Sequence, residues 1–431
     1  MSSSQLSGMT WRDVPAERIA GAPHACAHRL HERARIEWRT GDGDDPAVRM
    51  EALLDRHGLP VGDLARPVAP SGHGPGAVCG ATLFVSAAGA AHLIGAPAGA
   101  ATPAPRVPDL VAVVWQHGPG GVASTGVASP GVASPGGEPR DWQLGPWQPS
   151  WSPQQHAEAV SRVREAIARG DVYQVNVVGH AAATYTGDPT AALRRVVALP
   201  GARYAGVLAG DGWAVACASP ETLVRVAQGR VATSPIKGTR PATAQGRREL
   251  LSSVKERAEH VMIVDLERND LARVAKTGSV RVEELFAVRR WCDLWQAESQ
   301  VDARLADGVG LVDLLRAVAP GGSVTGAPKR AALAQIAALE PVGRGPSMGA
   351  LGWVGHDGLD LGLTIRTVAV DAERVHLWAG GGITWGSDPH AEVAEADAKA
   401  GPLRAALAGP HAGVAAGDAP PAAAPPRADA S

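Results

Sequence analysis

The sequence has few cysteines, few aromatic side chains other than tryptophan, and almost no net charge. Four cysteines occur among its 431 residues, and none is spaced as a metal or redox pair: Cys26, Cys79, Cys217 and Cys292. This usage, together with the lack of a basic-then-apolar leader, predicts a reducing, cytoplasmic location. The formal net charge of −2 gives no electrostatic reason to expect a nucleic acid or an anionic membrane as partner.

Several common functional signatures are also missing. No run of 18 apolar residues occurs, so the sequence predicts no transmembrane helix. There is no phosphate loop, no dinucleotide-binding glycine motif, no nucleophile elbow and no cysteine motif of a glutaminase.

Composition divides the chain into four parts. Residues 117–150 hold three copies of a five-residue unit, GVAST-GVASP-GVASP, and are expected to form a flexible loop or linker. Residues 409–431, rich in alanine and proline, are expected to be a disordered tail. Between them lies the strongly patterned region 151–408, and before the linker lies the weakly patterned region 1–116.

Within the first region, residues 78–85 and 110–115 have the continuous apolar pattern of buried strands. Three histidines near Cys26 have helical spacing: His24, His28 and His31. They suggest either a metal site or a solvated helix face, and the lack of a fourth ligand favours the helix face.

The region after the linker predicts an α+β fold. Ser152 and Pro153 mark the start of a helix that runs to Gly170. Strand patterns follow at 172–177, 204–209, 213–218, 222–233, 279–288, 359–370 and 374–379, and helical patterns at 246–270, 308–318, 327–339 and 389–408. Because the strands occur in adjacent groups rather than in strict βα alternation, we expect large, mainly antiparallel sheets flanked by helices.

Two helical patterns carry pairs of glutamates on one face. Glu256 and Glu259 are three residues apart, and so are Glu392 and Glu395, with Lys399 one turn further on. Carboxylates without histidine or cysteine partners suit a hard cation such as Mg²⁺. Spacing alone favours the simpler interpretation, in which these are solvated faces with surface ion pairs.

Glycine segments and one strand arginine could bind an anion. Residues 320–329, PGGSVTGAPK, lead into a helix, and Gly380, Gly381 and Gly382 follow a strand. Glycine allows backbone N–H groups to approach an oxyanion, and Arg366 could hold a carboxylate in bidentate fashion. Turn glycines and a structural ion pair are the alternative.

The segment Ser-Pro-Ile-Lys-Gly-Thr-Arg-Pro at 234–241 places Lys237 between apolar residues and a Gly-Thr pair. Burial would lower the pKa of this lysine and make its neutral amine available as a nucleophile. A partly exposed loop lysine is the alternative, and it is the more common case for an isolated lysine.

Taken together, these segments resemble the chorismate-utilising enzymes. That family includes anthranilate synthase component I, aminodeoxychorismate synthase component I, isochorismate synthase and salicylate synthase. The likeness covers about 150–408, whereas residues 1–116 resemble the family's N-terminal region only loosely. It rests on seven ordered segments: 170–176, 219–221, 234–241, 257–270, 322–329, 365–367 and 379–399.

The resemblance implies a role for each matching position. Glu259 and Glu395 correspond to Mg²⁺ ligands, supported through water by Glu256 and Glu392, and Glu221 corresponds to the general acid. The remaining positions imply contacts to the substrate: Gly238, Thr239, Gln174, Gln296, Ser323, Arg366, Gly380, Gly381, Gly382 and Lys399.

Two positions distinguish members of the family. Water-adding members carry a lysine base where this chain has Gln174, and a glutamine cannot deprotonate water. Anthranilate synthases typically carry alanine where this chain has Lys237, whereas in aminodeoxychorismate synthases a lysine there attacks C2 of chorismate. The resemblance therefore implies an aminodeoxychorismate synthase component I that works with a glutamine amidotransferase subunit.

Three departures from the family pattern concern other positions. A histidine is common where Gln296 stands, a tyrosine or tryptophan where Ser347 stands, and an arginine where Ala242 stands. The alternatives are an enzyme that aminates C2, namely an anthranilate or aminodeoxyisochorismate synthase, and a non-catalytic homologue that binds chorismate or tryptophan.

Overall fold

The structure is a computed structural model that describes residues 13–15, 29–118 and 142–409, apart from 60, 67, 69–71, 73, 98 and 373. The three copies of the five-residue unit lie outside the described residues, as do His24, Cys26, His28 and the tail beyond Gly409. The structure therefore does not test His24 and His28, either as metal ligands or as part of the favoured helix face, but His31 lies in the strand Arg29–Trp38 and not in a helix. The expected disorder of the tail remains a prediction. No helix in the described part of the chain is both long and apolar enough to span a membrane.

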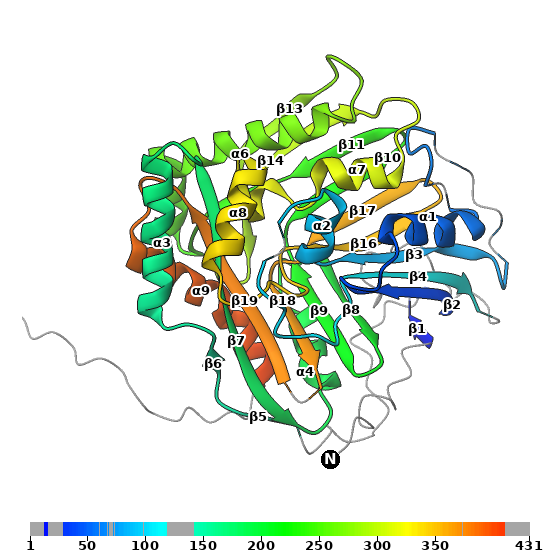
Figure 1. The fold of residues 1–431 in the computed structure, drawn as a ribbon, viewed down its shortest axis with the longest axis horizontal. Helices are drawn as coiled ribbons and strands as arrows, with labels where there is room; N and C mark the ends of the chain where they lie inside the picture. Colours follow the sequence, from blue (N-terminus) through cyan, green and yellow to red (C-terminus); the bar gives the residue numbers. More distant parts are fainter. Residues whose placement is uncertain are drawn as a thin grey trace, which may run out of the picture.

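Two large sheets form the framework of the described residues (Figure 1). The first has eleven strands, in the order β1 (Asp13–Pro15), β2 (Arg29–Trp38), β4 (Leu110–His117), β3 (Val78–Val85), β16 (Ala350–Gly355), β17 (Gly358–Leu363), β10 (Thr222–Ala227), β11 (Arg230–Ser234), β14 (Leu294–Arg304) and β12 (Ile236–Pro241), with β13 (Arg281–Trp291) also paired to β14.

The second sheet has eight strands among the described residues. Their order is β15 (Gly326–Ala327), β7 (Gln174–Thr186), β19 (Arg374–Ile383), β18 (Thr367–Asp371), β9 (Trp213–Ser219) and β8 (Tyr204–Gly210), and β5 (Gln143–Leu144) and β6 (Gln148–Pro149) also pair with β7. Neighbouring strands in both sheets run antiparallel. The predicted α+β fold with large antiparallel sheets is confirmed.

Helices cover the sheets from several sides (Figure 1). They are α1 (Pro46–Arg56), α2 (Ala87–Leu93), α3 (Pro153–Ala168), α4 (Thr190–Val197), α5 (Ala244–Ser252), α6 (Val254–Ala272), α7 (Leu311–Val318), α8 (Lys329–Leu339) and α9 (Pro389–Ala408). Helix α9 packs against β19, α3 and α4, whereas α6 packs against β12, β13 and β14. Because α6 packs on the first sheet and α9 on the second, a site between these two helices draws residues from both sheets.

Strand β3, from the N-terminal region, pairs directly with β16, from near the C-terminus. The register places Phe84 opposite Leu351, and both side chains are buried in the main hydrophobic core. Residues 30–117 and 350–363 therefore contribute to one continuous sheet and one core.

Three predicted elements are each divided in the structure. The segment 222–233 forms the two strands β10 and β11, and 246–270 forms α5 and α6. Ser253 separates these helices because it ends α5 and caps α6, its Oγ accepting from the N–H of Glu256 at 3.2 Å. The expected strand 359–370 was wrong as a single element, since β17 and β18 lie in different sheets.

Candidate active site

One pocket between the two sheets gathers nearly all of the predicted site residues. Its walls come from β12, β19, α6, α9 and the short 3₁₀ turn at Gly322–Val324. Among the predicted residues, those that line it are Glu221, Lys237, Gly238, Thr239, Glu256, Glu259, Gln296, Ser323, Arg366, Gly380, Gly381, Gly382, Glu392, Glu395 and Lys399. Gln174 does not line the pocket and lies behind Gly382, where an added Cβ would come 2.6 Å from the Gln174 Nε2.

The Lys237 amine is held inside this pocket. Its Nζ donates to the backbone carbonyl of Ser323 at 2.8 Å. Burial lowers the pKa of Lys237, the nearby Lys399 lowers it further, and Glu221 acts in the opposite direction. The alternative of a partly exposed loop lysine is corrected in one respect, because Lys237 lies in strand β12 rather than in a loop, with its amine turned into the pocket.

A bulge in β12 explains how this lysine reaches the pocket. The pairing of β12 with β14 shifts between Lys237 and Thr239, and the intervening Gly238 has φ of +76°. An added Cβ at Gly238 would lie 2.9 Å from Glu256 Oε2, so a side chain there would also crowd the carboxylate. Glycine is thus required both by its backbone conformation and by the close neighbour.

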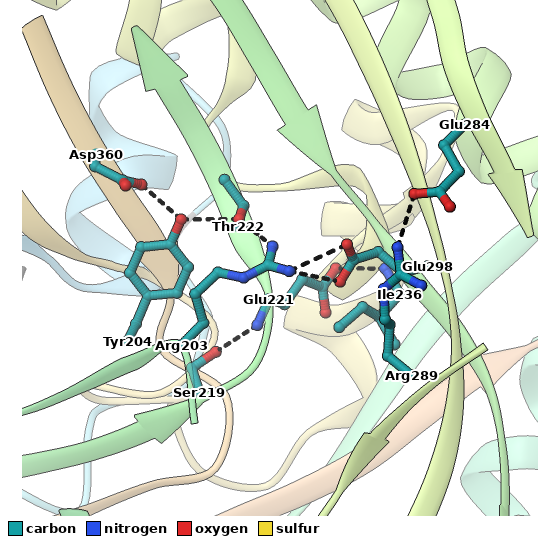
Figure 2. Close-up of polar contacts among 10 residues, drawn as sticks. All are labelled: Arg203, Tyr204, Ser219, Glu221, Thr222, Ile236, Glu284, Arg289, Glu298 and Asp360. Atoms are coloured by element: carbon teal, nitrogen blue, oxygen red, sulfur yellow. Dashed lines mark hydrogen bonds and ion pairs between the residues drawn. The ribbon is translucent and has the colours of Figure 1, made fainter. Parts of the chain in front are cut away.

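Glu221 lies directly beside Lys237 in the pocket. Its Oε1 accepts from the Ser323 hydroxyl at 2.5 Å. The same oxygen accepts from the backbone N–H of Ile236 at 3.2 Å (Figure 2). Burial raises the pKa of Glu221, against the lowering effects of Ser323 and Lys237. The result is a buried carboxyl with a tendency to keep its proton, as a general acid requires.

Arg366 lies between β17 and β18 rather than inside one strand, which corrects the sequence-based placement. It has φ of +51°, and its guanidinium is buried against the Trp291 ring. Its Nε has no hydrogen-bond partner among the described residues. Burial lowers the pKa of Arg366 to about 10, so the group stays charged at neutral pH and can receive an anion.

The four predicted metal-binding glutamates face the same pocket from two helices. On α6, Glu256 pairs with Arg240 at 2.9 Å, and Glu259 accepts from Thr384 Oγ1 at 2.6 Å. On α9, Glu395 pairs with Lys399 at 2.6 Å. These carboxylates are therefore not solvated surface groups, and that alternative is wrong.

The donor set fits a Mg²⁺ ion that shares its ligands with a substrate. Burial raises the pKa of Glu259 and of Glu392, and the neighbouring carboxylates of Glu256 and Glu395 add to it. Such crowding of negative charge is what a divalent cation offsets. In the described part of the chain, no three acidic, histidine or cysteine side chains form a ready-made metal cage. Mg²⁺ commonly needs only one or two carboxylates, with waters and substrate oxygens completing the shell.

The glycine run in β19 brings backbone close to these groups. An added Cβ at Gly381 would lie 3.0 Å from Glu392 Oε2, and one at Gly382 would lie 3.0 Å from Lys237 Nζ. The Lys399 ammonium donates to the carbonyl of Gly380 at 2.9 Å. Side chains at these positions would fill the space between the two helices' charged groups.

The structure also adds residues that were not among the predicted site positions. Asn176 lines the pocket, and its buried Oδ1 has no hydrogen-bond partner among the described residues. It lies two residues after Gln174 in β7, so its presence on the same face could have been predicted from the strand period. Arg240, Thr384 and Lys255 had no comparable signal, because their roles depend on contacts between elements distant in sequence.

Further polar contacts hold Thr222, the residue that follows Glu221. Figure 2 shows Arg203 bridging Thr222 and Glu298, with both Glu298 oxygens 3.1 Å from the same guanidinium nitrogen. Thr222 also accepts from the Tyr204 hydroxyl at 2.8 Å. This network ties the strand that follows Glu221 to β14.

Comparison with known proteins agrees with this geometry. A family described as chorismate binding enzyme matches residues 122–405. The chain belongs to this family. Anthranilate synthase component 1 of Streptomyces coelicolor is 42% identical over 60% of this chain and 52% of its own length. Aminodeoxychorismate synthase component 1 of Klebsiella aerogenes is 40% identical over 58% of this chain and 57% of its own length.

The chain spans about half the length of these curated relatives, and the two named activities are similarly close to it. Among solved structures, anthranilate synthase component I from Streptococcus pneumoniae matches with a TM-score of 0.70 and 24% identity, covering 87% of this chain and 91% of that one. A putative isochorismate synthase from Bacillus anthracis matches with a TM-score of 0.64 and 19% identity, covering 94% and 99%. These likenesses establish the fold.

Proposed function

We propose that this chain is an aminodeoxychorismate synthase component I, which converts chorismate and ammonia into 4-amino-4-deoxychorismate. The observation that carries the proposal is the buried Lys237 amine, held by the Ser323 carbonyl beside Glu221. A neutral amine that donates one N–H to a carbonyl keeps its lone pair free for attack.

The pocket offers separate positions for the two carboxylates of chorismate. Arg366 and the backbone of Gly380–Gly382 would hold the enolpyruvyl carboxylate, while Gly238 and Thr239 would contact the ring carboxylate. Mg²⁺ bound by Glu259 and Glu395, with Glu256 and Glu392 behind them, would neutralise the ring carboxylate. Charges on opposite walls would thereby fix the ring with its C2 towards Lys237.

The first chemical step forms a bond between the Lys237 nitrogen and C2. The ring electrons shift as the C4–O bond breaks, and Glu221 gives its proton to the departing hydroxyl, which leaves as water. In the second step ammonia attacks C4, and the C2–N bond breaks to release Lys237 as a neutral amine. The new ammonium at C4 returns one proton to Glu221, so the residues regain their starting state.

Two side chains in and next to the pocket, Gln174 and Asn176, favour ammonia over water as the second nucleophile. Gln174 is buried, and its amide cannot act as a base towards water, which disfavours hydroxylation of the ring. Asn176 offers an unpartnered acceptor that could hold an N–H of ammonia. We propose that the ammonia comes from a separate glutamine amidotransferase subunit and that the protein is cytoplasmic.

Product analysis tests the proposal. Purified protein with chorismate, Mg²⁺ and an ammonium salt should yield 4-amino-4-deoxychorismate by mass spectrometry. Lys237→Ala should lose this product or divert the reaction towards anthranilate. Lys255→Ala, at another lysine lining the pocket, serves as the matched control and should keep C4 as the site of amination.

Amination of C2 is the competing function, because the Streptomyces coelicolor relative is named an anthranilate synthase. Formation of fluorescent anthranilate by the wild-type chain would overturn the proposal in favour of that function. Lack of any turnover with Mg²⁺ and ammonia would instead favour a non-catalytic binding protein.

A further inference from the structure

A buried carboxyl outside the pocket reaches the turn that holds both catalytic groups. Glu267 lies on α6 with only 2% of its surface exposed. Its Oε1 accepts from the backbone N–H of Gly322 at 3.1 Å, and its Oε2 accepts from Thr233 Oγ1 at 3.4 Å. Neither the fold core nor the proposed chemistry requires an acidic residue there, so its contacts suggest a specific task.

The turn at Gly322–Val324 carries Ser323, which contacts the pocket through two different atoms. Its carbonyl accepts from Lys237 at 2.8 Å, and its hydroxyl donates to Glu221 at 2.5 Å. The position of this one residue therefore decides where both the amine and the carboxyl point. Gly322, which Glu267 holds, is its immediate neighbour.

We propose that Glu267 is a positioning residue that fixes the Ser323 turn and thereby orients the Lys237 amine for attack. The inference rests on the proposed function only for the chemical step, the attack of the oriented Lys237 amine on C2 of chorismate. The orientation itself depends on the chain of contacts from Glu267 through Gly322 and Ser323 to Lys237.

The close approach of Glu267 to the turn explains the glycine at position 322. An added Cβ there would lie 3.0 Å from Glu267 Oε1 and 2.6 Å from Leu266 Cδ2. The turn on the other side is held by Arg344, whose Nη1 donates to the Val324 carbonyl at 2.6 Å. The turn is thus held between two buried side chains, Glu267 at the N–H of Gly322 and Arg344 at the carbonyl of Val324.

Glu267 has the surroundings of a carboxyl that keeps its proton. Burial raises its pKa to about 8, and Asp270 adds to the effect, while the Lys329 ammonium acts against it. Asp270 pairs with Lys329 at 2.7 Å. The nearby charge of Glu221 also raises the pKa of Glu267. Because the contact to Gly322 needs only an acceptor oxygen, a glutamine can replace the protonated carboxyl.

The test measures the reactivity of Lys237 without substrate. The full chain is labelled with acetic anhydride over a range of pH, and mass spectrometry gives the labelling rate and apparent pKa of Lys237. In Glu267→Ala the apparent pKa of Lys237 should move up towards the ordinary value of about 10.4, so labelling slows at neutral pH, where less of the amine is neutral. The limiting labelling rate of the neutral amine, reached at high pH, should rise at least threefold, because the amine is released from the Ser323 carbonyl. The kcat for amination should fall about tenfold or more, with KM for chorismate changed less than threefold.

Two comparison variants separate positioning from general stability. Glu267→Gln keeps the acceptor oxygen and should restore both the labelling rate and kcat to within about threefold of wild type. Asp371→Ala removes another buried carboxylate that accepts from a backbone N–H at 3.1 Å, that of Arg106, outside the pocket. It should leave Lys237 labelling unchanged even where it lowers the melting temperature.

The proposal is overturned if Glu267→Ala labels like the wild type, or if Glu267→Gln behaves like Glu267→Ala. Should Glu267→Ala not fold, Gly322→Ala moves the same turn away from α6 and should give the same shift in Lys237 reactivity. Because labelling needs no turnover, the two proposals can fail separately. If the variants label as expected but the wild-type chain makes anthranilate, the proposed function is overturned while the positioning role of Glu267 stands.

Discussion

The guanidinium of Arg366 lies over the indole ring of Trp291, with its Cζ atom 4.7 Å from the ring centroid. A planar cation stacked on an aromatic face is held in one orientation while its N–H groups stay free for a ligand. Arg366 has a positive φ, and the chain passes there from the first sheet to the second.

Arg366→Lys should weaken the capture of chorismate. Lysine keeps the charge but loses the flat fork and its stacking on Trp291, and loss of a buried charged contact costs about 2–5 kcal/mol. Steady-state kinetics should show kcat/KM reduced by about 30-fold or more. Arg225→Lys, in an exposed pair with Asp360, is the control and should change kcat/KM less than about twofold. An unchanged KM in Arg366→Lys would argue against a carboxylate at this position.

Removal of Mg²⁺ should abolish amination, and the acidic residues of both helices should matter. Glu259→Gln and Glu395→Gln are each expected to weaken Mg²⁺ binding at least about tenfold, measured by calorimetry in the presence of chorismate. Glu249→Gln, at an exposed position on α5, is the control and should bind Mg²⁺ like the wild type. Full activity after treatment with EDTA would contradict the metal assignment.

Acid should destabilise the protein through two buried histidines in the second sheet. His180 and His376 contact each other at 3.1 Å, and burial lowers their pKa values from 6.5 to about 3 and about 4. Below pH 6.5 these histidines bind protons in the unfolded chain but stay neutral in the folded chain. Their contribution to the free energy of unfolding is therefore fully present above pH 6.5 and is lost as the pH is lowered. Each group contributes a slope of up to about 1.4 kcal/mol per pH unit.

Denaturant unfolding between pH 7 and pH 5 measures this slope. His376→Gln should flatten it even if the variant is less stable at pH 7, whereas His390→Gln, at an exposed position, should leave the slope unaltered. A slope that is the same in wild type and His376→Gln would show that other groups cause the acid sensitivity.

Arg344→Met should be strongly destabilising. Arg344 and Glu340 form a buried pair at 2.6 Å, and together they also satisfy Val178 N–H and the carbonyls of Asn176 and Val324. Removing one partner leaves an unpaired buried carboxylate, at a cost of about 3–5 kcal/mol in the free energy of unfolding. The exposed pair of Arg268 and Asp265 gives the comparison, since Arg268→Met should cost less than about 1 kcal/mol. Equal losses in the two variants would contradict this ranking.

The sequence was most informative where local chemistry fixes an element. Helix α9 begins at Pro389 as predicted, because Asp388 caps it by accepting from Ala391 N–H at 2.9 Å. The same holds for the start of α3, where Ser152 and Gln155 form a reciprocal cap. Both signals act within four residues, so no knowledge of the rest of the fold was needed.

The site was harder to predict, because its geometry depends on distant pairing. The apolar run 359–370 hides a change of sheet at Arg366, and no local signal marks that residue as a break. Likewise, Glu267 is one acidic residue in a helix rich in them, and its contact with Gly322 joins positions far apart in the chain. Lys237 was noticed from its apolar neighbours, but only the resemblance of other segments to a known family favoured a catalytic role over an ordinary loop lysine.

The pairing of β3 with β16 limits how this protein can be divided. Every residue of β16 is buried, so a chain lacking β3 would present Ala350–Gly355 as a bare, unprotected sheet edge. Exposed apolar edges recruit strands from other molecules and cause aggregation. The N-terminal region therefore cannot be exchanged as an independent domain. A recombinant chain joined at the linker would have to preserve the pairing of β3 with β16.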